Sequence, residues 1–234
     1  MQQVVSMAGF IFPSREEIIK YVSNNIDRKL GYGKEGCCFL LKSGIVIKVL
    51  VSCQQKEKII FSVKNNSFVF PKDYILVDGD VNAITMDYVR GKTLLKETPI
   101  FQSIAILGSQ LEKILEDVKK LSEKHIYVVD TFSGNIIYNK DGFKFIDTLN
   151  YAFLKDRDVL KDNTEDVMQH IYEVLLNELF FDKKLYSELS YINNKDFYYK
   201  PEEYLLLLKQ RIQDTYQEEV NTLEDAKKLI LRGH

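Results

Sequence analysis

The stretch VVDTFSGNIIYNKDGFKFIDT, Val128 to Thr148, places three small oxygen-bearing side chains around two short apolar runs. Asp130 and Asn135 lie in a loop that leads into the first run, Asn135–Tyr138. A turn signal follows at Asn139–Gly142, and Asp147 comes directly after the second run, Phe143–Ile146. Such residues serve either in solvated turns or as oxygen ligands around a metal and a phosphate. The rest of the sequence has to decide between these two interpretations.

The overall composition is that of an ordinary soluble globular protein. The chain has 234 residues, of which 45% are hydrophobic and 28% are charged, with no tryptophan and a formal net charge of −2. This length fits one large domain or two small lobes and allows a substantial core. Because the sequence contains no basic block, nucleic acid is not a favoured partner.

Cysteine usage and hydropathy favour a cytoplasmic location. Cys37, Cys38 and Cys53 show no CxxC spacing, which fits a reducing compartment and argues against a zinc site or a disulfide framework. The start, MQQVVSMAGFIF, lacks the basic residues and the long apolar core of a signal peptide. No run approaches the roughly 18 apolar residues that a membrane span needs. We therefore expect no membrane span.

The period of the hydrophobic pattern changes once, near residue 95. Before this point, Ser14 and Glu17 predict the capping box of one short helix, from Arg15 to about Asn24. Alternating runs separated by glycine-containing turns then predict a small antiparallel sheet, and Gln54–Lys64 could form a second short helix.

From residue 100 onward, apolar residues recur at spacings of three and four, which predicts long amphipathic helices. A sheet followed by helices is the order of an α+β fold. The sequence therefore predicts a β-rich lobe over residues 1–90, a helical lobe over residues 91–234, and a hinge at about residues 86–91.

The stretch GYGKEG contains an intact GxGxxG motif formed by Gly31, Gly33 and Gly36. Glycines allow backbone amides to approach phosphate oxygens closely. In dinucleotide-binding folds the motif opens a helix after a parallel strand. Here Cys37–Leu41 continues as a strand, so the sequence favours a phosphate-binding hairpin over a dinucleotide fold.

One lysine lies alone in the apolar strand IVIKVL. Strand alternation puts Lys48 on the same face as Val46 and Leu50. Such a lysine either reaches water from an edge strand or binds an anion, and the preceding glycine loop favours a phosphate. Glu57, the only glutamate of the expected second helix, either pairs with Lys48 or is a solvated surface charge.

The order of these features resembles that of the protein-kinase-like family: glycine loop, strand lysine, connector, D-x-x-x-x-N and strand-end aspartate. By this resemblance Lys48 matches the lysine of V-A-I-K, Asp130 the catalytic-loop aspartate, Asn135 the metal-binding asparagine, and Asp147 the aspartate of DFG. The likeness covers about residues 25 to 180. It is specific only when the features are taken together.

The connector MDYV resembles a kinase hinge. The resemblance implies that Met86 is the gatekeeper and that the backbone of Asp87 and Val89 hydrogen-bonds adenine. Asp166, in DVMQHIYEVLLNEL, resembles the helix aspartate that braces the catalytic loop from below.

The resemblance implies a bilobal kinase-like fold that binds ATP and Mg²⁺ and transfers the γ-phosphoryl group to a hydroxyl. Lys48 would hold the α- and β-phosphates, Asn135 and Asp147 would hold Mg²⁺, and Asp130 would accept the proton of the hydroxyl. The favoured expectation is a minimal serine/threonine protein kinase with a protein substrate. The chain resembles the minimal kinases found among bacterial effectors. This resemblance keeps open delivery into the cytoplasm of a host cell.

Several residues of the family pattern are absent. H-R-D is replaced by Val128-Val129-Asp130, and DFG by Asp147-Thr148-Leu149. No A-P-E motif follows, and fewer than 20 residues separate Asp147 from Asp166, which leaves no room for an ordinary activation segment. We therefore expect activity without activation-loop control.

These departures keep two alternatives open. The first is a pseudokinase, either a nucleotide-binding module or a purely structural interaction module. The second is a small-molecule kinase of the aminoglycoside or choline type. Those enzymes usually carry a large helical insertion, whereas the stretch between Gly91 and His125 has room for little more than one helix.

Overall fold

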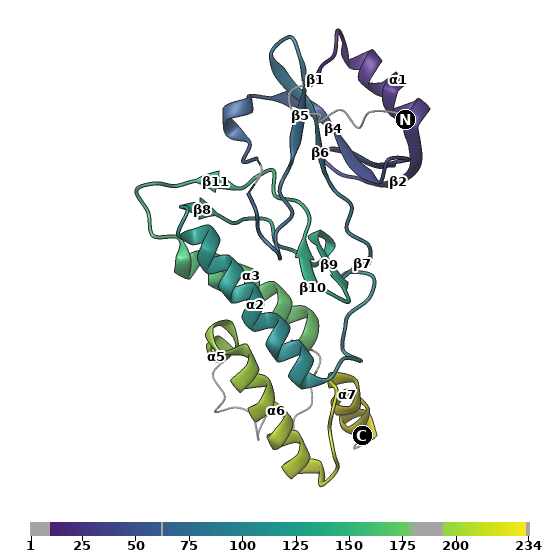
Figure 1. Ribbon diagram of the computed structural model, residues 1–234. Coiled ribbons are helices and arrows are strands. Elements are labelled where there is room, and N and C mark those ends of the chain that lie inside the picture. The colour runs from purple at the N-terminus through teal and green to yellow at the C-terminus, as the bar shows by residue number, and fades with distance from the viewer. Residues whose placement is uncertain (1–9, 62, 178, 180–193, 233–234) are drawn as a thin grey trace. The chain divides into compact units, whose positions relative to one another are not determined.

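A computed structural model describes residues 10–61, 63–177, 179 and 194–232 (Figure 1). These residues form a mixed α+β protein with an antiparallel sheet and six α-helices, so the predicted α+β class is confirmed. None of the described helices combines the length and the apolar character needed to cross a membrane.

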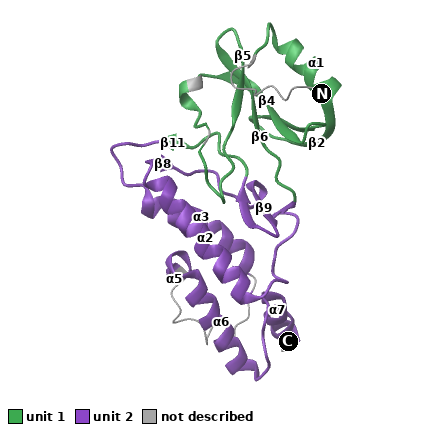
Figure 2. Cartoon of the chain, viewed as in Figure 1, with its two compact units in different colours: residues 1–90, 146–152 green, residues 91–145, 153–234 purple. Residues whose placement is uncertain are grey.

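The contacts divide the chain into two compact units (Figure 2). The first unit contains residues 1–90 and 146–152, and the second contains residues 91–145 and 153–234. The division predicted from sequence assigned residues 146–152 to the helical lobe. The structure instead packs this short segment, which carries Asp147, with the sheet.

The first unit is built on a six-stranded sheet with the order β1-β5-β6-β4-β3-β2, in which only β1 runs parallel to its neighbour. Its strands are β1 (Phe10–Ile11), β2 (Ile26–Tyr32), β3 (Gly36–Leu41), β4 (Ile45–Gln54), β5 (Asp73–Val77) and β6 (Asp80–Asp87). Asp78 and Gly79 join the last two with positive φ angles of 51° and 88°, as a tight hairpin turn requires.

Each face of this sheet has its own apolar cluster. On one face, Ile18 and Val22 of helix α1 (Arg15–Asn25) pack against residues such as Ile47 of β4. On the other face, Val46 and Leu50 pack with Leu149 of the segment 146–152. The predicted cap of α1 is present, since Ser14 Oγ accepts a hydrogen bond from the backbone N–H of Glu17.

The second short helix, expected over Gln54–Lys64, does not form. Strand β4 continues to Gln54, which pairs with Val81, and a single 3-10 turn, Lys56–Lys58, follows it. An isolated helix of eleven residues gains little because its first turn is costly to nucleate. Here extension of a central strand prevails over helix formation.

In its described residues, the second unit combines a small sheet of order β10-β9-β7 with five α-helices. Its strands are β7 (Lys92–Thr93), β8 (Ile126–Tyr127), β9 (Ile136–Asn139) and β10 (Gly142–Phe145), and β8 forms a two-stranded sheet with β11 (Ala152–Phe153). The register of Gly142 opposite Asn139 confirms the predicted hairpin. The helices are α2 (Ile104–Ser122), α3 (Leu160–Leu176), α5 (Asn194–Tyr199), α6 (Pro201–Tyr216) and α7 (Leu223–Arg232).

The helices of the second unit pack closely through small and aromatic residues. Gly108 of α2 lies against α6, since a Cβ atom there would be only 3.0 Å from the Cα of Glu202. Phe197 and Tyr204 are almost fully buried, and their rings meet the ring of Tyr172 edge to face. Phe197 and Tyr204 therefore belong to the core of the second unit.

Candidate functional site

Lys48 lies in the middle of the six-stranded sheet. It is opposite Cys38 of β3 on one side and Ile84 of β6 on the other. Only 4% of the residue is exposed. The interpretation of Lys48 as an edge-strand lysine that reaches water is therefore wrong, because β4 is a central strand. A buried ammonium in this position requires anionic partners.

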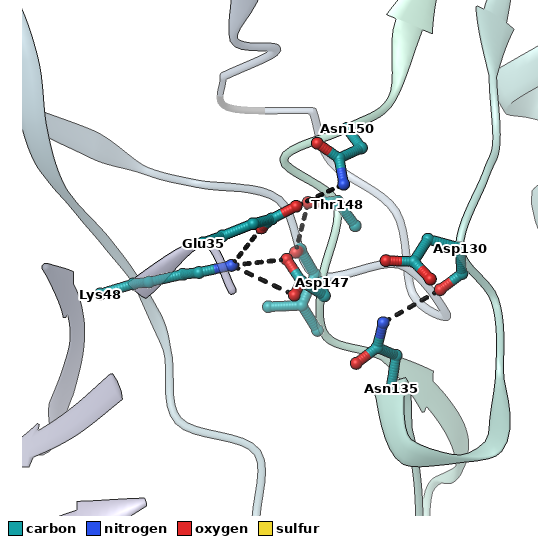
Figure 3. A network of polar contacts seen from close by, with 8 residues as sticks. Glu35, Lys48, Asp130, Asn135, Asp147, Thr148 and Asn150 are labelled. Atoms are coloured by element: carbon teal, nitrogen blue, oxygen red, sulfur yellow. Dashed lines mark hydrogen bonds and ion pairs between the residues drawn. The ribbon is translucent and has the colours of Figure 1, made fainter. Parts of the chain in front are cut away.

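Two carboxylates supply these partners (Figure 3). The Nζ atom of Lys48 lies 2.6 Å from Glu35 Oε2, and 2.9 and 3.1 Å from the two carboxylate oxygens of Asp147. Asp147 is 99 residues away in the chain, and both residues belong to the first unit. The Lys48 side chain is 6% exposed, whereas those of Glu35 and Asp147 are 25% and 26% exposed.

The electrostatics of this cluster favour a charged lysine. Burial alone would lower the pKa of Lys48, but the carboxylates of Asp147 and Glu35 outweigh it and hold the pKa above its ordinary value. One ammonium and two carboxylates sum to a net charge of −1. The cluster therefore combines the charged Lys48 ammonium with two carboxylates, which carry more negative charge than the lysine balances.

The segment 146–152 is held firmly against the sheet. Thr148 Oγ1 donates a hydrogen bond of 3.0 Å to the backbone carbonyl of Val69. Leu149 is 3% exposed and belongs to one of the sheet's apolar clusters. Tyr151, 2% exposed, meets the rings of Phe68 and Phe70 edge to face. These contacts fix the backbone on both sides of Asp147.

The glycine motif forms the hairpin between β2 and β3, which confirms that the chain continues as a strand after Gly36. The N–H of Gly33 donates to the carbonyl of Gly36 and closes the turn. Gly36 is required by packing, because a Cβ atom there would lie 2.3 Å from the backbone oxygen of Val49. Gly31 and Gly33 face open space.

Glu35, the residue before Gly36, links the hairpin to two other parts of the first unit. Its backbone carbonyl accepts a 2.8 Å hydrogen bond from the N–H of Val51 in β4. Its side chain contacts Lys48 through one oxygen and accepts a hydrogen bond from Asn150 through the other (Figure 3). Sequence reasoning treated Glu35 as a variable position of GxGxxG and missed both contacts.

The structure differs from the predicted pairing of Lys48 with Glu57. Glu57 lies in the exposed 3-10 turn that replaces the expected helix, and the carboxylates beside Lys48 are those of Glu35 and Asp147. Because β4 extends to Gln54 and no helix follows, Glu57 is not positioned against the sheet beside Lys48. The alternative of a solvated surface charge describes Glu57 better.

The predicted hinge residues lie at the end of β6 and just after it. Met86 is 7% exposed and belongs to the same apolar cluster as Leu149. Asp87 is exposed and forms an ion pair of 2.6 Å with Lys72, and Val89 is half-buried. The boundary between the two compact units follows Arg90.

Asp130 and Asn135 come together in the second unit. The amide nitrogen of Asn135 donates a 3.0 Å hydrogen bond to the backbone carbonyl of Asp130 (Figure 3). Asp130 is exposed and has a φ of 61°, a left-handed conformation that aspartate and asparagine adopt more readily than most residues. The amide of Asn135 thus holds a sharply turned loop whose carboxylate faces solvent.

Helix α3 anchors the chain just before Val129. Asn163, fully buried, accepts a hydrogen bond from the N–H of Val128 and donates to the carbonyl of Ile126 and to Ser122. The amide satisfies backbone groups of a buried irregular segment, which is costly to leave unpaired. A single sequence carried no signal that set Asn163 apart.

The predicted brace by Asp166 is present and acts through Thr131, the residue after Asp130. The hydroxyl of Thr131 donates to the carboxylate of Asp166 at 3.1 Å and lies 2.9 Å from Nδ1 of His170. Thr131 itself is 1% exposed. The loop that carries Asp130 is therefore tied to α3 from both of its ends.

The two predicted metal ligands, Asn135 and Asp147, are oxygen donors that lie in different compact units. The amide nitrogen of Asn135 is used on the Asp130 carbonyl, so its oxygen, Oδ1, is the atom left for a cation. Within the described residues, no group of three His, Cys, Asp or Glu side chains could hold a metal ion by itself. Mg²⁺ beside phosphates needs only one or two carboxylates, because phosphate oxygens and water complete its shell.

Two further features lie outside the predicted site. Burial raises the pKa of the Cys38 thiol to about 11, as expected for a cysteine that packs in the sheet rather than reacts. In the second unit, β7, the start of α2 and the turn between β9 and β10 line a pocket of about 570 Å³. None of the predicted site residues lines this pocket.

The structure thus brings the predicted residues together in two groups, one in each unit. Lys48 and Asp147 meet in the first, and Asp130 and Asn135 meet in the second. No protein-family model matches the chain, and a search of the curated proteins finds no match. A functional assignment therefore depends on the geometry and chemistry of these residues.

Proposed function

We propose that the chain is an ATP- and Mg²⁺-dependent phosphotransferase, most simply a minimal serine/threonine protein kinase that works without activation-loop phosphorylation. The observation that carries the proposal is the contact between Lys48 and Asp147. A buried lysine of a central strand meets an aspartate 99 residues later, beside a glycine hairpin. Burial of a charge for fold stability alone is unfavourable. Binding of phosphate and metal would explain why the Lys48 ammonium is buried here.

Each residue has a distinct role in the proposed reaction. Lys48 binds the α- and β-phosphates as a compact point charge, and the backbone of the glycine hairpin covers them. Asp147 and Asn135 supply oxygen ligands for Mg²⁺, which neutralises charge on the phosphates. The exposed carboxylate of Asp130 accepts or orients the proton of the acceptor hydroxyl.

Replacement of Asp130 tests the proposed reaction. Asp130 has a positive φ, which asparagine tolerates. Asp130→Asn is therefore a suitable variant, because it keeps the backbone conformation and removes the proton-accepting carboxylate. We expect phosphoryl transfer from radiolabelled ATP to fall by about 10²- to 10⁴-fold. ATP binding, measured by calorimetry with Mg²⁺, should change little.

The matched control is Asp141→Asn, an exposed aspartate in the hairpin turn between β9 and β10. This variant should transfer phosphate at the wild-type rate. An Asp130→Asn protein that keeps full activity would remove Asp130 from the reaction.

One observation favours a second candidate, a pseudokinase that binds nucleotide or a partner without turnover. Lys48 already has carboxylate oxygens of Glu35 and Asp147 around it, an arrangement that is stable as a structural ion cluster. Thermal-shift titration with ATP, with and without Mg²⁺, followed by turnover with radiolabelled ATP, separates the two candidates. Binding without turnover supports the pseudokinase, and absence of binding supports a purely structural module.

A further inference from the structure

The carboxylate of Glu35 occupies a position beside Lys48 that a phosphate group would need. We propose that Glu35 is a tethered competitor of the nucleotide's phosphates, so that its side chain must leave Lys48 before the phosphates bind. The inference rests on the proposed function, because it assumes that Lys48 is the phosphate-binding residue. It adds a specificity-determining residue to that site.

The hydrogen-bonding capacity of Lys48 is the first argument. Three oxygens lie between 2.6 and 3.1 Å from Nζ, one from Glu35 and two from Asp147. An ammonium group has three protons and no further donor. A phosphate oxygen can therefore bind Lys48 fully only if one of the two carboxylates moves away.

The attachment of the two carboxylates decides which of them moves. Asp147 lies in a segment whose next residues, Thr148 and Leu149, are hydrogen-bonded or buried in the apolar cluster. Glu35 lies at the tip of a hairpin beside exposed Gly33 and Lys34. Its backbone is fixed by the hydrogen bond from Val51, but its long side chain, which contacts Lys48 and Asn150, can turn toward solvent by rotation about its own bonds. Glu35 is thus the partner that can be displaced.

Charge gives this arrangement a preference among ligands. With Glu35 in place the cluster carries −1, from one ammonium and two carboxylates, and it repels a polyphosphate that is not neutralised by a metal. Once Glu35 has turned away, Lys48 and Asp147 balance each other. Glu35 therefore opposes binding of nucleotide phosphates and has no such effect on an uncharged nucleoside.

The test is the affinity of wild-type protein and of Glu35→Gln for ATP and for adenosine, measured by calorimetry with Mg²⁺ and with a chelator. Glutamine keeps the size and the possible contact with Asn150, but it loses the charge and one strong hydrogen bond to Lys48. We expect ATP to bind about tenfold more tightly to Glu35→Gln, with a larger gain in chelator, and adenosine to bind equally to both.

A second variant tests the same idea without changing charge. Asn150→Ala removes the hydrogen bond that holds the other oxygen of Glu35, and Asn150 is exposed, so folding should be unaffected. ATP should bind about two- to threefold more tightly. Glu17→Gln, an exposed glutamate of α1, is the matched control and should bind ATP as the wild type does.

The outcomes separate failure of the inference from failure of the proposed function. If wild-type protein binds ATP and Glu35→Gln binds it equally or more weakly, Glu35 positions Lys48 and does not compete, and the inference is overturned while the proposed function stands. If neither protein binds ATP under any condition, the proposed nucleotide site fails and the inference fails with it.

Discussion

At the scale of single residues, the buried Lys48 forms an ion cluster with two carboxylates rather than a simple ion pair. Lys48 is nearly inaccessible, while Glu35 and Asp147 each keep about a quarter of their side chains exposed. Charges in such a setting lose hydration, and the loss is offset only when geometry and hydrogen bonds are good. Two close carboxylates provide this compensation for one ammonium. The cluster is therefore sensitive to removal of its central charge.

Replacing Lys48 with methionine should destabilise the protein by about 2–4 kcal/mol, because Glu35 and Asp147 lose the cation that both contact. The pKa of Lys48 in the folded protein is raised above its ordinary value of 10.5. A raised pKa means that the lysine's contribution is complete below about pH 10 and is lost as pH rises through the folded pKa. Urea unfolding of both proteins between pH 7 and pH 11 measures the difference.

Using the difference between wild type and Lys48→Met cancels the titration of other groups, such as the buried tyrosines of the second unit. Asp147→Asn combined with Lys48→Met should cost less than the sum of the two single changes, since both remove the same interaction. Additive costs, or a difference that does not shrink at high pH, would contradict the ion cluster as described.

At the scale of secondary structure elements, the β2–β3 hairpin shows that glycine is needed for different reasons at the three glycine positions of one motif. Gly36 sits where the backbone of β4 approaches so closely that no side chain fits. Gly31 and Gly33 have open space around them, and neither has a positive φ. Of the three glycines, only Gly36 is explained by packing. The other two keep the surface of the hairpin free of side chains, which suits a close ligand.

Gly36→Ala should lower the free energy of unfolding by about 1–3 kcal/mol, because its methyl group would lie 2.3 Å from the Val49 oxygen and force β3 and β4 apart. Gly33→Ala is the matched control and should change stability by no more than about 0.5 kcal/mol. Chemical denaturation of both variants measures the two values. Equal effects at the two positions would show that the close approach of β4 is not what requires Gly36.

At the scale of the whole molecule, the chain returns to the first unit directly after the last strand of the small sheet in the second unit. Residues 146–152 follow β10 directly, yet they pack with residues 1–90. This return delivers Asp147 to Lys48 and Leu149 to the apolar cluster on the same face of the sheet. The core of the first unit is therefore incomplete without a segment that lies far along the chain.

Leu149→Ala should destabilise the protein by about 2–4 kcal/mol, since Leu149 is 3% exposed and fills part of this core. Hydrogen exchange should show lost protection in β4 and β6, whose residues Leu50 and Ile84 belong to the same cluster. Leu95→Ala, at a leucine that is 72% exposed, is the control and should have little effect. A loss of protection confined to the second unit would contradict the assignment of residues 146–152 to the first.

Much of the fold could be predicted from local patterns. Alternation placed Lys48 on the same face as Val46 and Leu50, and the structure puts all of this face toward one apolar cluster and the segment with Asp147. The turn signal at Asn139–Gly142 located the hairpin between β9 and β10, because turn residues must adopt particular backbone angles. The expected helix over Gln54–Lys64 was wrong, because pairing with a neighbouring strand outweighed a weak local preference for helix.

The amino-acid sequence by itself selected the candidate site residues and determined on which face of its strand Lys48 lies, because these properties follow from side-chain type and from the two-residue period of a strand. Only the tertiary structure decided the partners of Lys48. Glu57 is nearer in sequence to Lys48 than Glu35 is, yet the hairpin register brings Glu35 to its ammonium, and the return of the chain adds Asp147. Ion pairs form between atoms that folding brings within a few ångströms, and distance along the chain carries little information about that.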